Sequence, residues 1–249
     1  MKSWVKEIKR QQKMHKWARA KYKIDTKQTL LSDMPSRYFS TLRLISQFIT
    51  SNHLMILDVG CSDGYYLDYV RQYSKQIKAY GVDIFFDSLL RAKALGINTI
   101  CAAGEFLPFK DETFDAIFCF EVIEHSARSS LLLKNIKRIL KPRGIILLST
   151  PLQSQPGKVG QRILDKLRSY ENPIWGWKLV HFKEYSKKEM ISIFNEVGLD
   201  VVHSELSFNR GIRLISVYMP LGRQILTLLT KLLLNQYWHL QQFYVLRKL

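Results

Sequence analysis

The stretch that most constrains the fold runs from Leu54 to Gly64 and reads L-M-I-L-D-V-G-C-S-D-G. Its apolar first part, residues 54–59, is typical of a strand buried in a parallel sheet. The glycines that follow predict a tight turn, and residues 65–74 predict a helix. A glycine turn between a strand and a helix leaves unpaired backbone N–H groups pointing to one place. It therefore predicts a binding site for a polar ligand.

A second acidic strand end follows at Tyr80-Gly81-Val82-Asp83, nineteen residues after Gly64. A carboxylate in this place is suited to the ribose hydroxyls of a nucleotide-type ligand. The spacing alone leaves both a dinucleotide and S-adenosylmethionine open, although the G-x-G-x-x-G of a typical dinucleotide site is absent. Asp58, at the end of the first strand, adds a carboxylate that can accept hydrogen bonds or face a cationic group.

Further strand and helix patterns alternate along the chain. Strands are predicted at 98–102, 116–120 and 145–150, and helices at 88–95 with Asp87 as N-cap, at 128–140, and at 186–198 behind an S-K-K-E capping box. Residues 200–208 and 212–218 predict a terminal antiparallel hairpin. The fold class is therefore α/β, a doubly wound and mostly parallel seven-stranded sheet. Its ligand lies at the carboxyl ends of the strands.

Composition separates one domain from two terminal segments. Residues 31–219 form the α/β domain, and 151–184 form an irregular insertion on its substrate side. Residues 1–30 predict a basic helix or arm, which could be a lid, a surface helix, or a contact to a membrane or nucleic acid. Residues 220–249 predict an apolar and aromatic amphipathic helix, which lies at a membrane interface or packs against protein.

The chain carries 38 Lys and Arg against 21 Asp and Glu, a formal charge of +17. This excess favours an anionic partner, namely nucleic acid, an acidic membrane surface or a phosphorylated substrate, over a merely solvated basic surface. Cys61, Cys101 and Cys119 show no metal-binding spacing and indicate core residues in a reducing compartment. The first residues lack the apolar segment of a signal peptide, so a cytoplasmic protein is expected, peripheral on the membrane if the terminal helix is interfacial.

Four motifs downstream of the glycine turn complete the pattern: Leu107-Pro108-Phe109, Phe114-Asp115-Ala116, Glu121-Val122-Ile123-Glu124-His125 and Leu140-Lys141-Pro142-Arg143-Gly144. Together with Asp58, they resemble the class I S-adenosylmethionine-dependent methyltransferases. The similarity is strongest to the branch with quinone-pathway and small-molecule or lipid methyltransferases. The resemblance covers residues 54–151, with a weaker similarity at 181–198. The resemblance implies a Rossmann-like methyltransferase fold and S-adenosyl-L-methionine as cofactor.

The resemblance also implies roles for individual residues. The methionine part of the cofactor is assigned to Asp58, Gly60, Cys61, Ser62 and Gly64, the ribose to Asp83, the adenine to Gly104 and Glu105, and further contacts to Ile84 and Phe120. Two positions depart from the family pattern. Ala103 stands where relatives carry an adenine-binding acid, for which Glu105 or Gly104 could substitute. Ser62 stands where glycine is common, so we expect a negative φ there.

The catalytic candidates are Glu121, Glu124 and His125, which share one face if this segment is helical. His125 is suited to be the base that takes a proton from an oxygen nucleophile. A similar E-x-x-E-H motif with a later histidine, here His181, binds a divalent metal in small-RNA 2′-O-methyltransferases, and elsewhere the motif only shapes the pocket. We assign no metal ligand.

These observations predict methyl transfer to an oxygen of a small or lipid-linked acceptor at the cytoplasmic membrane face. One alternative is an RNA 2′-O-methyltransferase with a divalent metal at Glu121, Glu124, His125 and His181. Another is a partner protein that binds S-adenosylmethionine without catalysis. The sequence favours nucleic acid less than a membrane and leaves the oligomeric state open.

Overall fold

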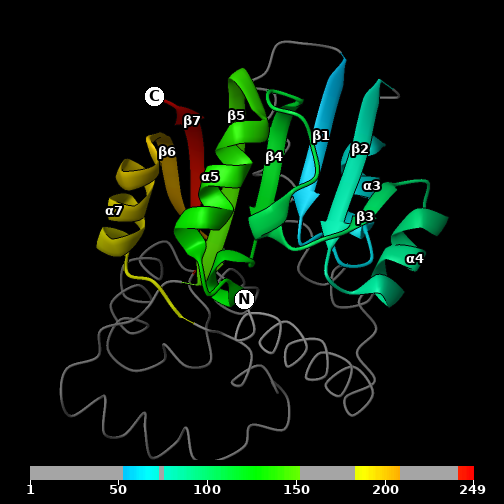
Figure 1. Cartoon of the computed structure of the whole chain (residues 1–249), viewed down its shortest axis with the longest axis horizontal. Coiled ribbons are helices and arrows are strands. Elements are labelled where there is room, and N and C mark those ends of the chain that lie inside the picture. The colour runs from blue at the N-terminus through cyan, green and yellow to red at the C-terminus, as the bar shows by residue number, and fades with distance from the viewer. Residues whose placement is uncertain (1–52, 73–75, 152–182, 208–240) are drawn as a thin grey trace, which may run out of the picture.

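Seven strands form a mixed sheet in the order β3-β2-β1-β4-β5-β7-β6, in a computed structural model that describes residues 53–72, 76–151, 183–207 and 241–249 (Figure 1). The strands are β1 (Leu54–Val59), β2 (Ile77–Asp83), β3 (Asn98–Cys101), β4 (Phe114–Phe120), β5 (Leu140–Pro151), β6 (Leu199–Ser207) and β7 (Gln241–Lys248). The first five are parallel, and β7 is antiparallel to both of its neighbours. The predicted fold class is confirmed.

Helices cover both faces of this sheet, as Figure 1 shows. The helices are α3 (Tyr65–Arg71), α4 (Phe86–Ala94), α5 (Ser129–Ile139) and α7 (Lys187–Val197), with short 3-10 helices η1 (Gly104–Phe106) and η2 (Ile123–His125). One core cluster joins α5 and α7 to the sheet, and a second joins α3 and α4 to its other face. In β4, Ile117 and Cys119 belong to the first cluster and Phe118 to the second. Burial on both faces explains why the strands are almost continuous apolar runs.

The predicted helix over 220–249 is wrong at its end, because residues 241–248 form strand β7 between β5 and β6. The reason is that Phe243 to Leu246 are buried in the sheet, and an apolar run without a period fits a central strand and a helix equally well. β6 therefore pairs with β7, whereas the predicted hairpin partner 212–218 lies outside the described residues. Residues 1–30, 220–240 and nearly all of 151–184 also lie outside the described residues.

Two local predictions also differ from the structure. α4 begins at Phe86, so Asp87 lies in its first turn rather than at its N-cap, where its charge still favours the helix dipole. Cys101 is exposed on the edge strand β3, while Cys61 and Cys119 are buried as expected.

The capping box at the start of α7 is confirmed. The Ser186 hydroxyl accepts from the Glu189 N–H at 3.3 Å, and Glu189 Oε2 accepts from the Ser186 N–H at 2.9 Å. A hydrogen bond from Lys183, followed by those from Ser186, lowers the pKa of Glu189 to about 2. Gly198 ends the helix with a φ of 73°.

Ser186→Ala should lower the free energy of unfolding by about 1 kcal/mol, because a helix N–H loses its cap. Urea unfolding followed by circular dichroism measures it. Because the pKa of Glu189 is depressed in the folded state, Glu189 stabilises the fold at pH values above the ordinary carboxyl pKa. This stabilisation is lost as the pH falls towards 2. Ser130→Ala, which removes an exposed 3.3 Å bond to Glu196, is the control and should change stability by less than about 0.5 kcal/mol. Equal effects of both changes would contradict the capping role.

Candidate functional site

The turn between β1 and α3 lies at the carboxyl edge of the sheet and depends on two glycines. Gly60 and Gly64 have φ values of 81° and 76°, which side-chain-bearing residues rarely adopt. A Cβ at Gly60 would overlap the side chain of Val122, and one at Gly64 would lie 2.7 Å from the Cβ of Ala92. The turn therefore packs tightly between α4 and the loop that follows β4.

Ser62 adopts a φ of 48°, so the expected negative φ is wrong. The backbone N–H of Ser62 donates to Asp83 Oδ2 at 2.8 Å, while Gly60 and Cys61 donate their N–H groups to the Val82 carbonyl. These bonds hold the turn against the end of β2 and impose its backbone conformation on the serine. Asp83 also accepts from the Phe85 N–H at 2.9 Å, so one carboxylate organises two turns.

Three buried carboxylates surround this turn, since Asp58, Asp63 and Asp83 are between 2% and 7% exposed. Burial raises the pKa of Asp58 well above its ordinary value, and the charge of Asp83 raises it further. Burial also raises the pKa of Asp83, although backbone hydrogen bonds oppose this. Asp63 pairs with Arg91 at 2.9 Å. A site with this surplus of acidic groups favours a ligand that carries positive charge.

Cys61 contributes to the turn through its backbone and its packing. Its sulfur fills the space beside Gly81, where a Cβ would lie 2.5 Å from it. Burial raises the pKa of the Cys61 thiol, with Asp58 and Asp83 adding to the effect. The thiol therefore stays protonated, which excludes it as a nucleophile at neutral pH.

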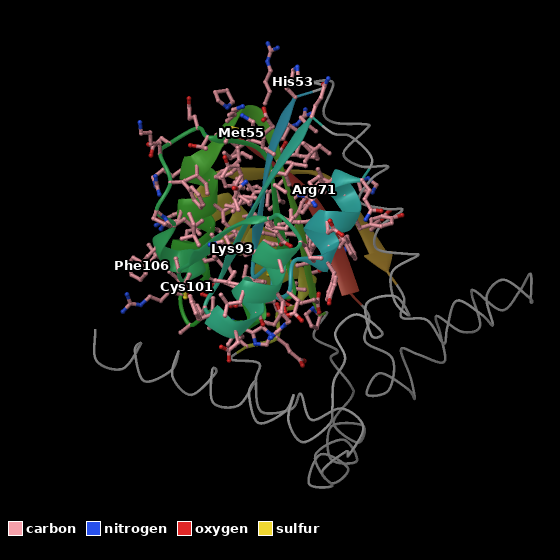
Figure 2. All side chains as sticks on the ribbon, turned by 90° about the vertical axis from the view of Figure 1, so that its right-hand side faces the viewer. His53, Met55, Arg71, Lys93, Cys101 and Phe106 are labelled. Atoms are coloured by element: carbon pink, nitrogen blue, oxygen red, sulfur yellow. The ribbon has the colours of Figure 1, made fainter. Side chains whose placement is uncertain are left out.

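The third part of the site follows β3 at η1. A Cβ at Gly104 would lie 2.5 Å from the Cδ1 atom of Leu132, so a larger residue here would displace that side chain. Glu105 is buried, and its Oε1 accepts a hydrogen bond from the Ser126 hydroxyl at 2.6 Å. Phe106, the next residue, is exposed and marks the position of η1 in Figure 2. Ile84 follows Asp83 and is half-buried, while a contact of Glu105 or Ile84 with the cofactor stays a prediction.

The expected helical face of Glu121, Glu124 and His125 is wrong, because only Ile123–His125 forms a 3-10 turn. Glu121 precedes it with a φ of 56°, and its Oε1 accepts from the Ser149 hydroxyl at 2.9 Å. Glu124 is fully buried, and its Oε2 accepts from the Thr150 hydroxyl at 3.2 Å. Strained backbone of this kind is typical of functional sites.

A metal site has no support in the described part of the chain, where no group of three His, Cys, Asp or Glu is arranged to hold an ion. His181, the fourth residue of the suggested set, lies outside it. Glu121 and Glu124 are bonded instead to the hydroxyls that end β5.

Two features at this end of the sheet were not predicted, although Phe120 itself was assigned to the cofactor. The first is a row of aromatic rings in which Phe120 lies 5.0 Å from Tyr66 and 5.8 Å from Phe243, between centroids. The second is the set of hydroxyls at Ser126, Ser149 and Thr150. The polar Ser-Thr pair at the carboxyl end of the apolar β5 run was an available signal, whereas the aromatic row depends on the pairing of β7.

A methyltransferase-domain model matches residues 30–204, which is most of the chain. The chain belongs to this methyltransferase family. The recognition from sequence is thereby confirmed, and the chain contains an S-adenosylmethionine-dependent methyltransferase domain.

The similar proteins are named for different activities. A tRNA U34 carboxymethyltransferase of Nautilia profundicola is 31% identical over 162 residues, covering 60% of this chain and 51% of the relative. A ubiquinone biosynthesis O-methyltransferase of Coxiella burnetii is 31% identical over 115 residues, covering 44% and 48%. The chain thus spans about half the length of the curated relatives it matches.

Solved structures support the fold. A putative methyltransferase from Bacillus halodurans superposes with a TM-score of 0.60 at 16% identity, covering 83% of this chain and 97% of that one. The [4+2]-cyclase SpnF superposes equally well, with a TM-score of 0.60 at 15% identity over 84% and 80%. At such identities the likeness shows the fold alone.

The residues of this methyltransferase domain fit its cofactor. S-adenosylmethionine carries a cationic sulfonium and an ammonium group, and the site offers buried carboxylates at Asp58 and Asp83, whereas Asp63 is already paired with Arg91. Gly60 and Gly64 give the turn its positive φ values and its close packing against Val122 and Ala92, which fixes the course of the backbone at this site. When bound, the cofactor supplies a methyl group already activated on sulfur.

Affinity for S-adenosylmethionine should rise with pH until the raised pKa of Asp58 is passed, by up to about tenfold per unit. Below that pKa the carboxyl holds a proton that a cationic ligand must displace. The same raised pKa makes the unliganded fold less stable as the pH rises from the ordinary carboxyl pKa to the raised pKa of Asp58. The reason is that the folded state binds the proton more tightly than the unfolded state. Calorimetric titration between pH 5 and 8 measures the affinity. Asp58→Asn should flatten the profile, and a flat wild-type profile would contradict the linkage.

Proposed function

We propose that this protein transfers a methyl group from S-adenosylmethionine to an oxygen of a small or lipid-linked acceptor. The observation that carries the proposal is the position of His125. It ends the 3-10 turn of the loop whose Val122 packs against the glycine turn at Gly60. His125 follows Val122 by three residues, and an imidazole that reaches bound cofactor from this loop would be suited to take a hydroxyl proton near neutral pH.

The protein's contribution is positioning and proton transfer. Bound S-adenosylmethionine would supply the methyl group to the acceptor oxygen, and His125 would take the hydroxyl proton that this oxygen gives up. The strained Glu121, held by Ser149, fixes the loop that carries this histidine. Tyr66, Phe120 and Phe243 form a row of aromatic rings at the end of β4, and we propose that this row contacts an acceptor with an apolar body.

The distribution of charge supports an anionic partner. The described residues hold 16 Lys and Arg and 16 Asp and Glu, so the formal excess of +17 belongs entirely to the rest of the sequence. Segment 152–182 follows the carboxyl end of β5 and is succeeded by Lys183, whose N–H donates to the Glu124 carbonyl. Segment 208–240 joins β6 to β7 at the same edge, since Pro151 and Ser207 both pair with Gln241. Residues 208–240 are apolar, with four basic residues and no acid, which favours the surface of an acidic membrane.

The full-length protein should bind phosphatidylcholine vesicles that contain phosphatidylglycerol and should not bind pure phosphatidylcholine vesicles. Replacement of Arg210, Arg213, Arg223 and Lys231 by glutamine should reduce partition at least about tenfold, since each basic residue near an anionic surface contributes about 1 kcal/mol. Sedimentation measures it, and unchanged S-adenosylmethionine binding serves as the control for folding. Removal of residues 220–249 is unsuitable because it deletes β7. Among the residues that the structure describes, no helix is long and apolar enough to cross a membrane.

Transfer of a methyl group to RNA is a second candidate, supported by the charge excess and by the similarity to a tRNA carboxymethyltransferase. Incubation with radiolabelled S-adenosylmethionine and either lipid extract or total tRNA separates the two. Label in tRNA, lost on chelation, would replace the lipid proposal. Cofactor binding without label in either pool would support the non-catalytic alternative.

A further inference from the structure

A buried hydrogen bond joins the loop after β3 to the loop after β4. The hydroxyl of Ser126 donates to Oε1 of Glu105 at 2.6 Å, a length typical of bonds to a charged acceptor. Glu105 and Ser126 are only 8% and 7% exposed, although they lie 21 residues apart in the chain. Such a bond fixes the separation of the two loops because water cannot replace either partner without opening the structure.

Helix α5 holds both partners of this bond. Asn135 of α5 donates its side-chain amide to the Glu105 carbonyl at 2.8 Å. The backbone N–H of Arg128, at the start of α5, donates to the Ser126 hydroxyl at 3.1 Å. The single hydroxyl proton of Ser126 is thus directed to Glu105, and an oxygen lone pair to Arg128. The pair therefore has one defined geometry.

The loop that contains Ser126 also carries the proposed base. The backbone N–H of His125 donates to the Val122 carbonyl at 2.9 Å, and that of Ser126 donates to the Ile123 carbonyl at 3.2 Å. In so short a turn a shift of Ser126 displaces His125 as well. Val122 packs against Gly60, so the same loop is fixed to the cofactor turn at one end and to Glu105 at the other.

We infer that Glu105 and Ser126 form a positioning pair that sets the imidazole of His125 relative to bound cofactor. In this inference Glu105 acts through Ser126 rather than as the substitute for the missing adenine-binding acid. Cofactor that binds beside Gly104 and Glu105 then changes the position of His125. Occupation of the cofactor site is thereby coupled to the geometry of the acceptor site. The inference rests on the proposed function through the role of His125.

Histidine NMR tests this coupling without an acceptor. The full-length protein is labelled at the histidine ring carbons, the His125 signal is assigned with His125→Gln, and S-adenosylhomocysteine is added to saturation. The wild-type His125 signal should shift on binding. Ser126→Ala should reduce the shift by roughly half or more, and so should Glu105→Ala, because the link is broken. Glu105→Gln should retain it, since the amide oxygen still accepts from Ser126.

Ser130→Ala is the matched control. It removes an exposed 3.3 Å hydroxyl bond to Glu196 near the start of α5 but leaves Glu105 and Ser126 joined, so the shift should persist. A full shift in Ser126→Ala, or an equal loss in Ser130→Ala, would overturn the inference. If His125→Gln keeps full turnover on an acceptor, the proposed base is wrong, and that result is separate because the NMR measurement involves no turnover.

Discussion

Gly60→Val should reduce the affinity for S-adenosylmethionine by about a hundredfold or more. Gly60 has a φ of 81°, which a β-branched residue adopts only with strain, and a Cβ there would overlap Val122. Strain and overlap together cost about 3 kcal/mol, which the free turn relieves by changing its conformation. Cofactor binding must restore the original turn, so the affinity falls by roughly two orders of magnitude. Calorimetric titration measures the affinity, and circular dichroism verifies that the sheet is intact.

A double change separates the two causes. Gly60→Ala combined with Val122→Ala removes most of the overlap and keeps the cost of the positive φ, so the loss should fall to about tenfold. If Gly60→Val in a folded protein bound cofactor within about threefold of wild type, the glycine turn would not be the cofactor site.

His125→Gln should lower kcat by about 10² to 10³ and leave S-adenosylhomocysteine affinity within about threefold of wild type. The amide preserves polarity but cannot take up the proton, and positioned general bases contribute rate factors of this size. Turnover is measured with radiolabelled cofactor on the acceptor pool that accepts label.

His203→Gln is the control, since this histidine lies on β6 beside Glu205. Its turnover should equal that of wild type. A kcat of His125→Gln close to that of wild type would leave the E-x-x-E-H loop with a structural role only.

Local patterns predicted most of the fold. The glycine turn and the capping box were recognised because each is defined by residues a few positions apart, such as Ser186 and Glu189. β7 was misassigned because Phe243 to Leu246 form an apolar run whose partners on β5 and β6 are distant in the chain. Hydrophobic pattern alone does not distinguish such a strand from a buried helix.

The sequence named the residues of the candidate site, whose contacts with the cofactor stay a prediction, but it did not predict the hydrogen bonds among them. The positive φ of Ser62 follows from a hydrogen bond to Asp83, 21 residues away, and the orientation of Glu105 follows from Ser126 at the same separation. Neither partner is visible in a pattern of neighbouring residues. The motif E-x-x-E-H singled out the loop after β4 but gave no indication that the hydroxyls of Ser149 and Thr150 donate hydrogen bonds to its two glutamates.

The place of β7 has a consequence for how the chain is made. Its two neighbours, β5 and β6, are both synthesised before it. Until β7 is synthesised, the edges of β5 and β6 that pair with it stay unpaired. Exposed strand edges are templates for pairing with other chains, and domains in this state are prone to aggregate. Prematurely terminated chains would keep both edges open, so incomplete products should be captured by chaperones and proteases far more than the finished protein.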